Sequence, residues 1–344
     1  MTAGELMTAF AERTGLTGVN PERRYLWTDA YAVCNFLELG TIDQARALID
    51  RVHHTLGRHR DDDPRRGWIS GLSEADGEAH PTLGGLRIGK PLPERAAAEP
   101  MDERLEWNRD GQYFHYLTKW MHALDQIARA TGDGQLGTWA RELADTTHRR
   151  FVYDSRGARR MHWKMSIALM RPQVASMGQH DPLDGYVTCL QLEETPGRGP
   201  DLGPAKIDYR AMIEPHTLAT ADPLGIGGLL VDASRLAQLD RDHSLRESIL
   251  AAARIGIEHY ATQPDLRRPA DQRLAFRELG LAIGLAAVEG VAAFAQFQRL
   301  RETITAFWSE AAYRRSPSYR KHQDINDVML ATSLVPGGVL VLRR

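Results

Sequence analysis

The chain has 344 residues, enough to bury a sizeable core, and its 43 Lys and Arg residues nearly balance its 45 Asp and Glu residues. This balance gives no electrostatic basis for binding nucleic acid or an anionic membrane surface. Two distant cysteines, Cys34 and Cys189, make no disulfide framework, and we expect both to be buried thiols in helices.

The N-terminal segment contains no basic start followed by an apolar run, so no secretory signal is expected. No uncharged apolar segment reaches the roughly 20 residues that a helix needs to span a bilayer. We therefore expect a cytoplasmic protein that does not act on membranes.

The first half of the chain predicts two helical hairpins. Residues 28–39 are nearly all apolar or small, which is typical of a buried helix. Residues 42–56 carry apolar side chains at helical spacing with charged residues between them, which predicts an amphipathic partner helix after a short turn. Residues 113–127 and 136–151 repeat this arrangement around the Gly-rich turn 131–134.

The second half continues the pattern. One pair is expected over 222–239 and 243–260, and another begins near Phe276 and continues past Gly290 towards Trp308. Six stretches in all open on an acidic residue followed by small and apolar ones, near positions 29, 110, 182, 222, 278 and 325. Six such hairpins predict a single all-α domain over residues 1–344, an (α/α)6 toroid with long loops between hairpins.

Two long segments fall outside this repeat. Residues 57–107 contain proline, glycine and mixed charge, which exclude a regular helix through much of the segment, and residues 154–180 form the second long loop. Long structured loops in compact domains usually carry function. Residues 337–342 are expected to form a short strand or an extended tail.

The acids at the helix starts have a structural interpretation. Asp is a strong N-cap, Pro is favoured at the first helical position, and an acid in the first turn complements the helix dipole. Asp181-Pro182, Asp222-Pro223 and Asp324 fit this scheme. Capping and function are compatible, because caps at the inner-helix starts of a toroid would surround one central depression.

Paired carboxylates suggest a hydrolase of glycosidic bonds. That chemistry needs one carboxylic acid to protonate the leaving oxygen and one carboxylate to activate water or attack the sugar. We favour Asp184 and Asp110 for these roles, with Asp181, Glu106 and Glu278 as substitutes.

Histidines beside acids open a second possibility. His180 precedes Asp181, and His322 lies two residues before Asp324. A carboxylate can orient an imidazole and raise its pKa, so such couples suit proton exchange at a carbon in a sugar epimerase or isomerase. The same four residues could form a metal site, but no local His-x-x-x-His or Cys-x-x-Cys spacing supports one, and we expect no metal.

Aromatic residues alternate with polar ones at several helix starts, which suits a polar, sugar-like ligand. Rings stack on the apolar faces of sugars, while charged and amide groups hold hydroxyls. The candidate substrate-binding residues are Tyr25, Trp27, Asp29, Trp107, Arg109, Tyr113, His115, Trp163, Lys164, Asp222, His322 and Asp324.

Motifs for other chemistries are missing from the sequence. The run from Gly84 to Lys90 lacks the glycine spacing of a phosphate-binding loop, and no Gly-x-Ser-x-Gly nucleophile elbow occurs. We therefore expect no cofactor, and a small carbohydrate-like molecule as the partner.

The six acid-led hairpins with polar-aromatic loops before them resemble the six-hairpin glycosidase-like superfamily. The run Trp107-Asn108-Arg109-Asp110-Gly111-Gln112 is loosely similar to the Trp-x-Arg-Gly-x-Gly-Trp stretch of unsaturated glucuronyl hydrolases, but differs at Asp110 and lacks the final Trp. N-acylglucosamine 2-epimerases share the toroid and use histidines, a role that His180 and His322 could fill. The resemblance implies a carbohydrate-active enzyme. A glycosidase is the first expectation, an epimerase or isomerase the second, and a non-catalytic sugar- or protein-binding toroid the third.

Overall fold

The computed structural model describes residues 1–174, 176–262 and 264–343, and α-helices dominate them. The chain divides into two compact units. Unit 1 contains residues 1–20, 34–41 and 214–342, and unit 2 contains residues 21–33, 42–213 and 343.

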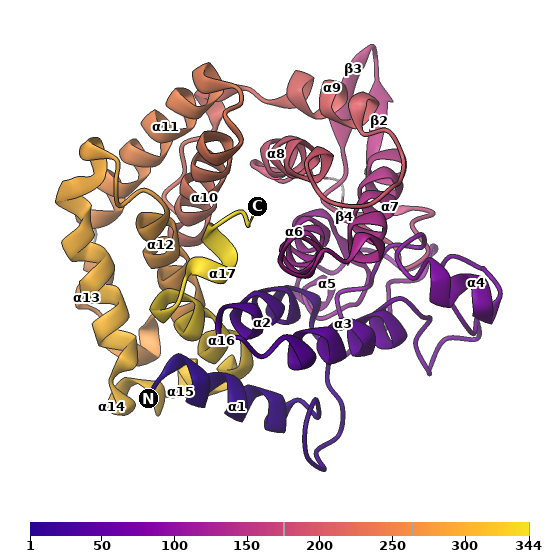
Figure 1. The fold of residues 1–344 in the computed structure, drawn as a ribbon, viewed down its shortest axis with the longest axis horizontal. Helices are drawn as coiled ribbons and strands as arrows, with labels where there is room; N and C mark the ends of the chain where they lie inside the picture. Colours follow the sequence, from indigo (N-terminus) through magenta and orange to yellow (C-terminus); the bar gives the residue numbers. More distant parts are fainter. Residues whose placement is uncertain (175, 263, 344) are drawn as a thin grey trace. The chain divides into compact units, whose positions relative to one another are not determined.

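Unit 2 is built on helical hairpins joined by long loops (Figure 1). Its longer helices are α2 (Leu26–Glu38, which continues into unit 1), α3 (Ile42–Leu56), α6 (Phe114–Thr131), α7 (Gly134–Phe151), α8 (Asp181–Glu193) and α9 (Gly203–Met212). Helix α6 packs against both α7 and α8, and α8 packs against α9. The buried rings of Phe114, Trp120 and Tyr209 lie among these helices.

The turn between α6 and α7 shows how the sequence ends one helix and begins the next. Gly132 caps α6 with φ of 71°, a left-handed conformation that glycine adopts without a steric penalty. Asp133 then caps α7, and its carboxylate accepts a hydrogen bond from the backbone N–H of Gln135 at 3.1 Å. The two helices pack side by side as a hairpin.

The loops of unit 2 carry short elements. The segment between α3 and α6 contains α4 (Glu74–Ala79), α5 (Glu103–Glu106) and strand β1 (Gln112–Tyr113). The segment between α7 and α8 contains β2 (Val152–Ser155), β3 (Ala158–Met161), β4 (Lys164–Met165) and β5 (Pro172–Val174). Strands β2 and β3 form a hairpin, and β1, β4 and β5 form an antiparallel sheet in the order β1-β4-β5.

Unit 1 contains a row of three contacting helices. These are α10 (Pro223–Leu239), α12 (Ala275–Ala287) and α16 (Gln323–Leu334), and α11 (His243–Thr262) packs on α10 while α13 (Gln298–Ser309) packs on α12 (Figure 1). Short helices complete the unit: α14 (Ala311–Arg314), α15 (Pro317–Lys321), α17 (Gly337–Leu340), η1 (Pro215–Thr217), η2 (Pro264–Arg267), η3 (Ala270–Gln272) and η4 (Ala292–Phe297).

Small residues allow α10 and α12 to pack closely. A Cβ at Gly227 would lie 2.1 Å from the backbone oxygen of Gly280, and one at Gly284 would lie 2.5 Å from the Cα of Gly227. Small residues predicted that these helices are buried, and in the structure the glycines let the two helix backbones touch directly.

The N-terminal helix α1 (Ala3–Arg13) supplies the partner of α16, against which it packs. The Arg13 guanidinium donates to Asp324 at 2.9 Å and to Asp327 at 2.7 Å, and Tyr319 donates to Asp327 at 2.9 Å. The last long helix of the chain, α16, is thus paired with the first, α1.

The predicted hairpins agree with the structure, with local corrections. Five of the six acid-led openings lie in or next to the first turn of an inner helix, and the opening near Asp110 lies four residues before α6. Asp222 caps α10 as expected, with Gly225 donating to it at 3.3 Å, but the caps of α8 and α16 are His180 and His322 rather than Asp181 and Asp324. The extended tail was wrong, because residues 337–340 form helix α17.

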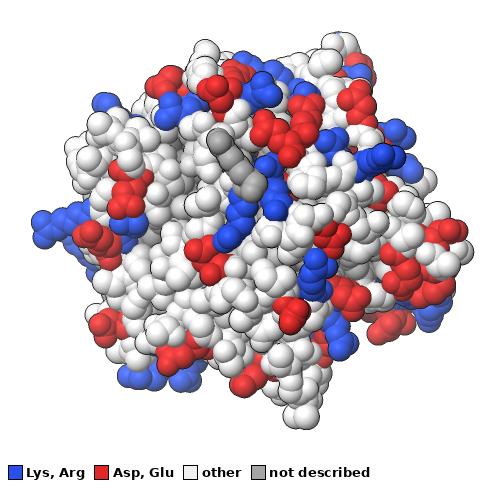
Figure 2. Space-filling view, viewed as in Figure 1, with Lys and Arg blue, Asp and Glu red and all other residues white. Residues whose placement is uncertain are grey.

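Charges are mixed over the surface drawn in Figure 2, where acidic and basic side chains are interspersed among uncharged ones. Charged side chains form ion pairs, such as Arg46 with Asp133 at 2.8 Å and Arg65 with Asp63 at 2.6 Å. Both cysteines are buried thiols in helices, as expected. Among the described residues, no helix has the length and apolar character needed to cross a bilayer.

Candidate active site

Aromatic rings from three elements of unit 2 form one contiguous cluster. Trp27 and Tyr31 come from α2, and their ring centroids lie 5.2 Å apart. His115 and Tyr116 come from the first turn of α6, and Trp27 lies 6.2 Å from the first ring and 5.5 Å from the second. Trp27 is buried, whereas Tyr31, His115 and Tyr116 are half-buried and reach the surface of the protein.

The small sheet brings Trp163 to this cluster. Pairing of β1 with β4 places Tyr113 opposite Lys164, and Trp163 immediately precedes that pair. The Trp163 ring stacks on Tyr113 at 5.1 Å and lies parallel to the His115 imidazole at 6.3 Å, with an interplanar angle of 11°. The sheet therefore aligns a row of rings leading away from the start of α6.

Two acids in the first turn of α8 face the same region. Asp181 and Asp184 are spaced i, i+3, which places them on one face of the helix. Asp184 accepts hydrogen bonds from Thr118 at 2.5 Å and from the Lys119 ammonium at 2.8 Å. Among the described residues Asp181 pairs with no such cation: its Oδ1 lies 3.9 Å from Nδ1 of His115, and its buried Oδ2 has no hydrogen-bond partner.

These surroundings separate the protonation states of the groups. Burial, together with the charge of Asp184, raises the pKa of Asp181 to about 8, so its carboxyl group is protonated at neutral pH. Burial, together with the charge of Lys119, lowers the pKa of His115 to about 4, so its imidazole is neutral. The ammonium of Lys119 at 2.8 Å stabilises the charged form of Asp184.

The Asp181 side chain is nearly enclosed, with 7% of its surface exposed. Gly178 packs against its carboxyl group, since a Cβ at that position would lie 2.3 Å from Oδ2 and 2.7 Å from Oδ1. The gap of 3.9 Å between Oδ1 and the His115 nitrogen is too long for a direct hydrogen bond. An oxygen of water or of a ligand placed between the two groups would bond to both of them.

Asp110, a favoured acid in the sequence, lies in a fully buried ion-pair network. Its Oδ2 accepts from Arg87 at 2.9 Å and from Arg60 at 3.3 Å. Its Oδ1 accepts backbone N–H groups of Gly89, Lys90 and Gly111 at 2.9, 3.3 and 3.1 Å. The network ties residues 87–90 to the start of β1, and Lys90 extends from it over the Tyr25 ring at 5.6 Å.

Glu106 and Lys164 form a second buried pair. The Lys164 ammonium has no exposed area and donates to the Glu106 carboxylate at 2.7 Å and to the backbone oxygens of Glu106 and Arg109, both at 2.9 Å. Arg95 reaches the other oxygen of Glu106 at 3.3 Å, and Arg109 pairs with Glu99. Both predicted residues therefore hold the loop before β1, and Lys164 lies 5.3 Å from the Tyr113 ring.

At the start of α2, Asp29 also has local partners. It accepts from the Arg24 guanidinium at 3.3 Å and from the backbone N–H of Tyr25 at 2.9 Å. This places the Tyr25 hydroxyl 2.6 Å from the hydroxyl of Tyr116, next to the aromatic cluster.

Four of the remaining candidates, Glu278, Asp222, Asp324 and His322, lie in unit 1. Glu278 receives Arg273 at 2.8 Å and the indole N–H of Trp308 at 2.8 Å, and Asp222 pairs with Arg277 at 2.8 Å. Asp324 pairs with Arg13, and His322 contacts the Phe276 ring at 6.0 Å.

In unit 2, His180 is the N-cap of α8 and Trp107 is exposed beside Trp163 at 5.9 Å. Among the described residues, no three His, Cys, Asp or Glu side chains gather as a metal site.

Three members of the cluster were not among the predicted residues: Lys119, Tyr31 and Tyr116. The spacing of Lys119 offered a signal, because it lies one helical turn after His115 and on the same face of α6. Its partner Asp184 is 65 positions away, so the ion pair itself could not be recognised from the sequence.

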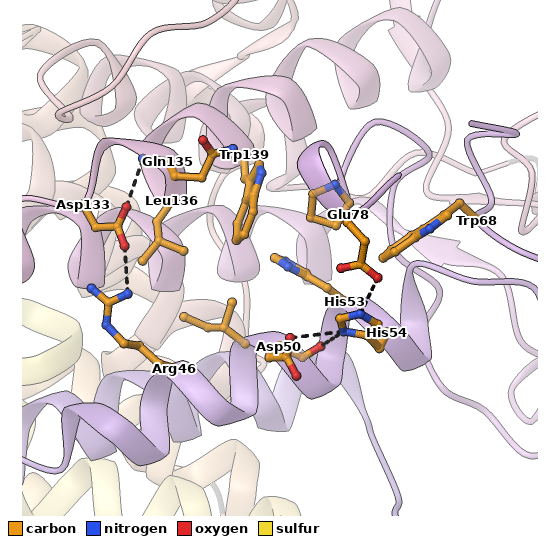
Figure 3. A pocket seen from close by; sticks show the side chains of 12 residues that line it. Arg46, Asp50, His53, His54, Trp68, Glu78, Asp133, Gln135, Leu136 and Trp139 are labelled. Atoms are coloured by element: carbon orange, nitrogen blue, oxygen red, sulfur yellow. Dashed lines mark hydrogen bonds and ion pairs between the residues drawn. The ribbon is translucent and has the colours of Figure 1, made fainter. Parts of the chain in front are cut away.

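A separate cavity of about 170 Å³ lies between α3, α4 and the start of α7 (Figure 3). The rings of His53 and Trp139 meet at 5.0 Å, and Trp68 forms another wall. Burial lowers the pKa of His53 to about 3, and its Nε2 accepts the indole N–H of Trp120 at 3.1 Å. The rim carries two pre-formed ion pairs, Arg46 with Asp133 and His54 with Glu78. Asp133 and Glu78 each have a basic partner there. Neither therefore resembles Asp181 on α8, which pairs with no lysine or arginine among the described residues.

Comparisons with known proteins agree on the fold. No protein-family model matches the chain, and no curated protein matches it in sequence. The structure is similar to a GH76 alpha-mannanase from Bacteroides thetaiotaomicron, with a TM-score of 0.59 and 8% identity over 98% of this chain and 96% of the other. It is also similar to a D-mannose isomerase, with a TM-score of 0.55 and 12% identity over 96% and 95% of the two chains. The chain therefore has the (α/α)6 toroid fold, as the acid-led hairpins predicted.

Proposed function

We propose that this protein is a carbohydrate-active enzyme that hydrolyses a glycosidic bond, with Asp181 as the general acid and Asp184 as the ionised carboxylate. One observation carries the proposal: within a single helical turn Asp181 is buried with no hydrogen-bond partner for its Oδ2 among the described residues, whereas Asp184 pairs with the Lys119 ammonium at 2.8 Å. Environments that drive two acids apart in this way identify acid and base roles in glycosidases.

In this scheme Asp181 protonates the leaving glycosidic oxygen through Oδ1, the edge that faces His115. The neutral imidazole holds the same oxygen by a hydrogen bond and helps to orient it. Asp184 stabilises the positive charge that develops on the sugar ring and attacks it or activates water. Asp110 and Glu106 act as positioning residues, because each is enclosed by cations that hold the loops behind the site.

The aromatic cluster supplies the surface for a sugar. Half-buried Tyr31, Tyr116 and Trp163 offer ring faces and hydroxyls beside the acids. The two structures of similar fold are named for α-mannan and for mannose, and we therefore propose an α-mannoside as the first substrate to test.

The test is hydrolysis of aryl α-mannosides and α-linked manno-oligosaccharides by the purified protein, read as release of aryl alcohol or reducing ends. Proton NMR of the first-formed anomer then distinguishes inversion from retention. Turnover of none of a broad panel of glycosides, while the same sugars bind, would overturn the hydrolase proposal in favour of a binding protein.

The protonation state of Asp181 sets the alkaline limb of activity. Below about pH 8 the carboxyl group carries the proton it must donate, and above that pH the proton is lost, since burial raises its pKa to about 8. We expect kcat/KM to fall about tenfold for each unit above that pH. A pH–rate profile from pH 5 to 10 measures it, and a profile flat to pH 9.5 would exclude Asp181 as the acid.

A sugar isomerase is the second candidate, and the contact between His115 and Asp181 favours it. A neutral imidazole 3.9 Å from a protonated carboxyl group is also suited to moving a proton between two carbons or oxygens of a bound sugar. Incubation of mannose with the protein in heavy water decides between the two. Carbon-bound deuterium in recovered sugar supports the isomerase, and its absence together with glycoside cleavage supports the hydrolase.

A further inference from the structure

Exposed apolar side chains gather on one loop of unit 2. Leu92, Met101, Leu105 and Trp107 expose 37, 49, 42 and 56% of their surfaces. The backbone closes this loop, because Leu92 donates to Asn108 at 3.1 Å and accepts from Asp110 at 2.8 Å. Scattered exposed apolar residues are ordinary, whereas a group on one ordered loop marks a contact surface.

Trp107 continues the row of rings that begins at the acid pair. Its centroid lies 5.9 Å from that of Trp163, whose ring is parallel to His115 at 6.3 Å. His115 in turn lies 3.9 Å from Asp181. The row thus leads from Asp181 through His115, at the start of α6, and Trp163, next to β4, to the exposed indole of Trp107.

The exposed indole is carried on a fixed backbone. The buried Lys164 ammonium donates to the backbone oxygens of Glu106 and Arg109, which lie on either side of Trp107. Asp102 caps the short helix α5 that leads into it, accepting from Arg104 at 2.9 Å. A ring held in this way loses little conformational freedom when a ligand stacks on it.

We propose that the substrate is an oligosaccharide whose outer sugar ring stacks on Trp107, so that the site binds at least two linked sugars. This inference rests on the proposed carbohydrate function of the acid pair. The C–H groups on one face of a sugar ring match the electron-rich face of an indole, and its hydroxyls stay in water, as the exposure of Trp107 requires. A free monosaccharide held at Asp181 would leave Trp107 without a role.

The test measures binding in an Asp181→Asn background, which prevents turnover. Isothermal titration compares α-linked mannotetraose with methyl α-mannoside, and maltotetraose with methyl α-glucoside. We expect the tetrasaccharide of the accepted sugar to bind more tightly than its monosaccharide. Trp107→Ala should reduce that ratio of affinities about tenfold, and Trp107→Phe should retain most of it.

Leu105→Ala is the matched control, since it removes an exposed apolar side chain from the same loop without removing a ring. It should leave the ratio unchanged. An equal loss in Leu105→Ala would identify the loop as a general apolar docking surface, such as one for a protein, and would overturn the inference. Tetrasaccharides that bind no more tightly than their monosaccharides would also overturn it. Failure of the hydrolase proposal is recognised separately, as the absence of turnover of any glycoside by the natural protein.

Discussion

Asp181→Asn should reduce turnover of the accepted glycoside by about a hundred- to ten-thousand-fold. The substitution removes the proton that the leaving oxygen needs and keeps the size and shape of the side chain. Asp184→Asn should reduce turnover to a similar degree, because it removes the negative charge that opposes the developing charge on the sugar. Steady-state kinetics on purified variants measures both effects.

Asp181→Asn should raise the melting temperature and Asp184→Asn should lower it, although both reduce turnover. The loss of activity can therefore be distinguished from a loss of folded protein. Between the ordinary pKa of 3.8 and about 8, folded Asp181 retains a proton that the unfolded chain has lost. Its contribution to stability is therefore complete below pH 3.8 and falls by about 1.4 kcal/mol for each pH unit up to about 8. An amide does not ionise, so Asp181→Asn should melt at a higher temperature than the natural protein at pH 7.5.

Asp184→Asn should instead lower the melting temperature, since it leaves the Lys119 ammonium without its partner at 2.8 Å. Thermal unfolding of both variants at pH 4.5 and pH 7.5 tests these signs. The gain from Asp181→Asn should shrink at the lower pH, where the unfolded chain also begins to hold the proton. A destabilised Asp181→Asn at both pH values would show that Asp181 is held as a structural carboxylate, and the acid role would fail with it.

Helix positions could be predicted because their signals are local. Apolar spacing, Asp-Pro starts and glycine-rich turns determine α6, α7, α8 and α10 within a few residues. The pairing of α16 with α1 had no local signal, since it depends on contacts such as Arg13 with Asp327, 314 positions apart. The short helix at 337–340 was missed because its two glycines and its valine are poor helix formers, and tertiary packing overrides that preference.

The candidate site was predictable in its residue types and not in its roles. The sequence singled out Asp181, Asp184 and His115 near helix starts and Trp163 in the long loop 154–180. Which acid is protonated depends on burial and on the distance to Lys119, and neither quantity can be obtained from spacing along the chain. Asp110 illustrates the same difficulty, because its partners Arg87 and Arg60 are 23 and 50 positions away.

Asp110→Asn should be among the most destabilising single changes in unit 2. It leaves Arg60 and Arg87 without their shared carboxylate at a fully buried position, and breaking such a pair costs about 3–5 kcal/mol. For a chain of this length, the melting temperature should fall by roughly 4–7 °C. Differential scanning calorimetry measures the change, and Asp62→Asn is the control, since it removes the exposed partner of the same Arg60 and should cost under about 1 kcal/mol.

The same variant decides what Asp110 does in the reaction. If Asp110 only positions residues 87–90 and the start of β1, the folded fraction of Asp110→Asn should keep kcat within about tenfold of the natural protein at low temperature, because the acid pair on α8 is untouched. The KM should rise more, since Lys90 and Tyr25 beside the aromatic cluster lose their anchor. A stable variant with a kcat reduced a thousandfold would instead place Asp110 in the chemistry, as the sequence first indicated, and Asp184 would then hold Lys119 rather than act on the sugar.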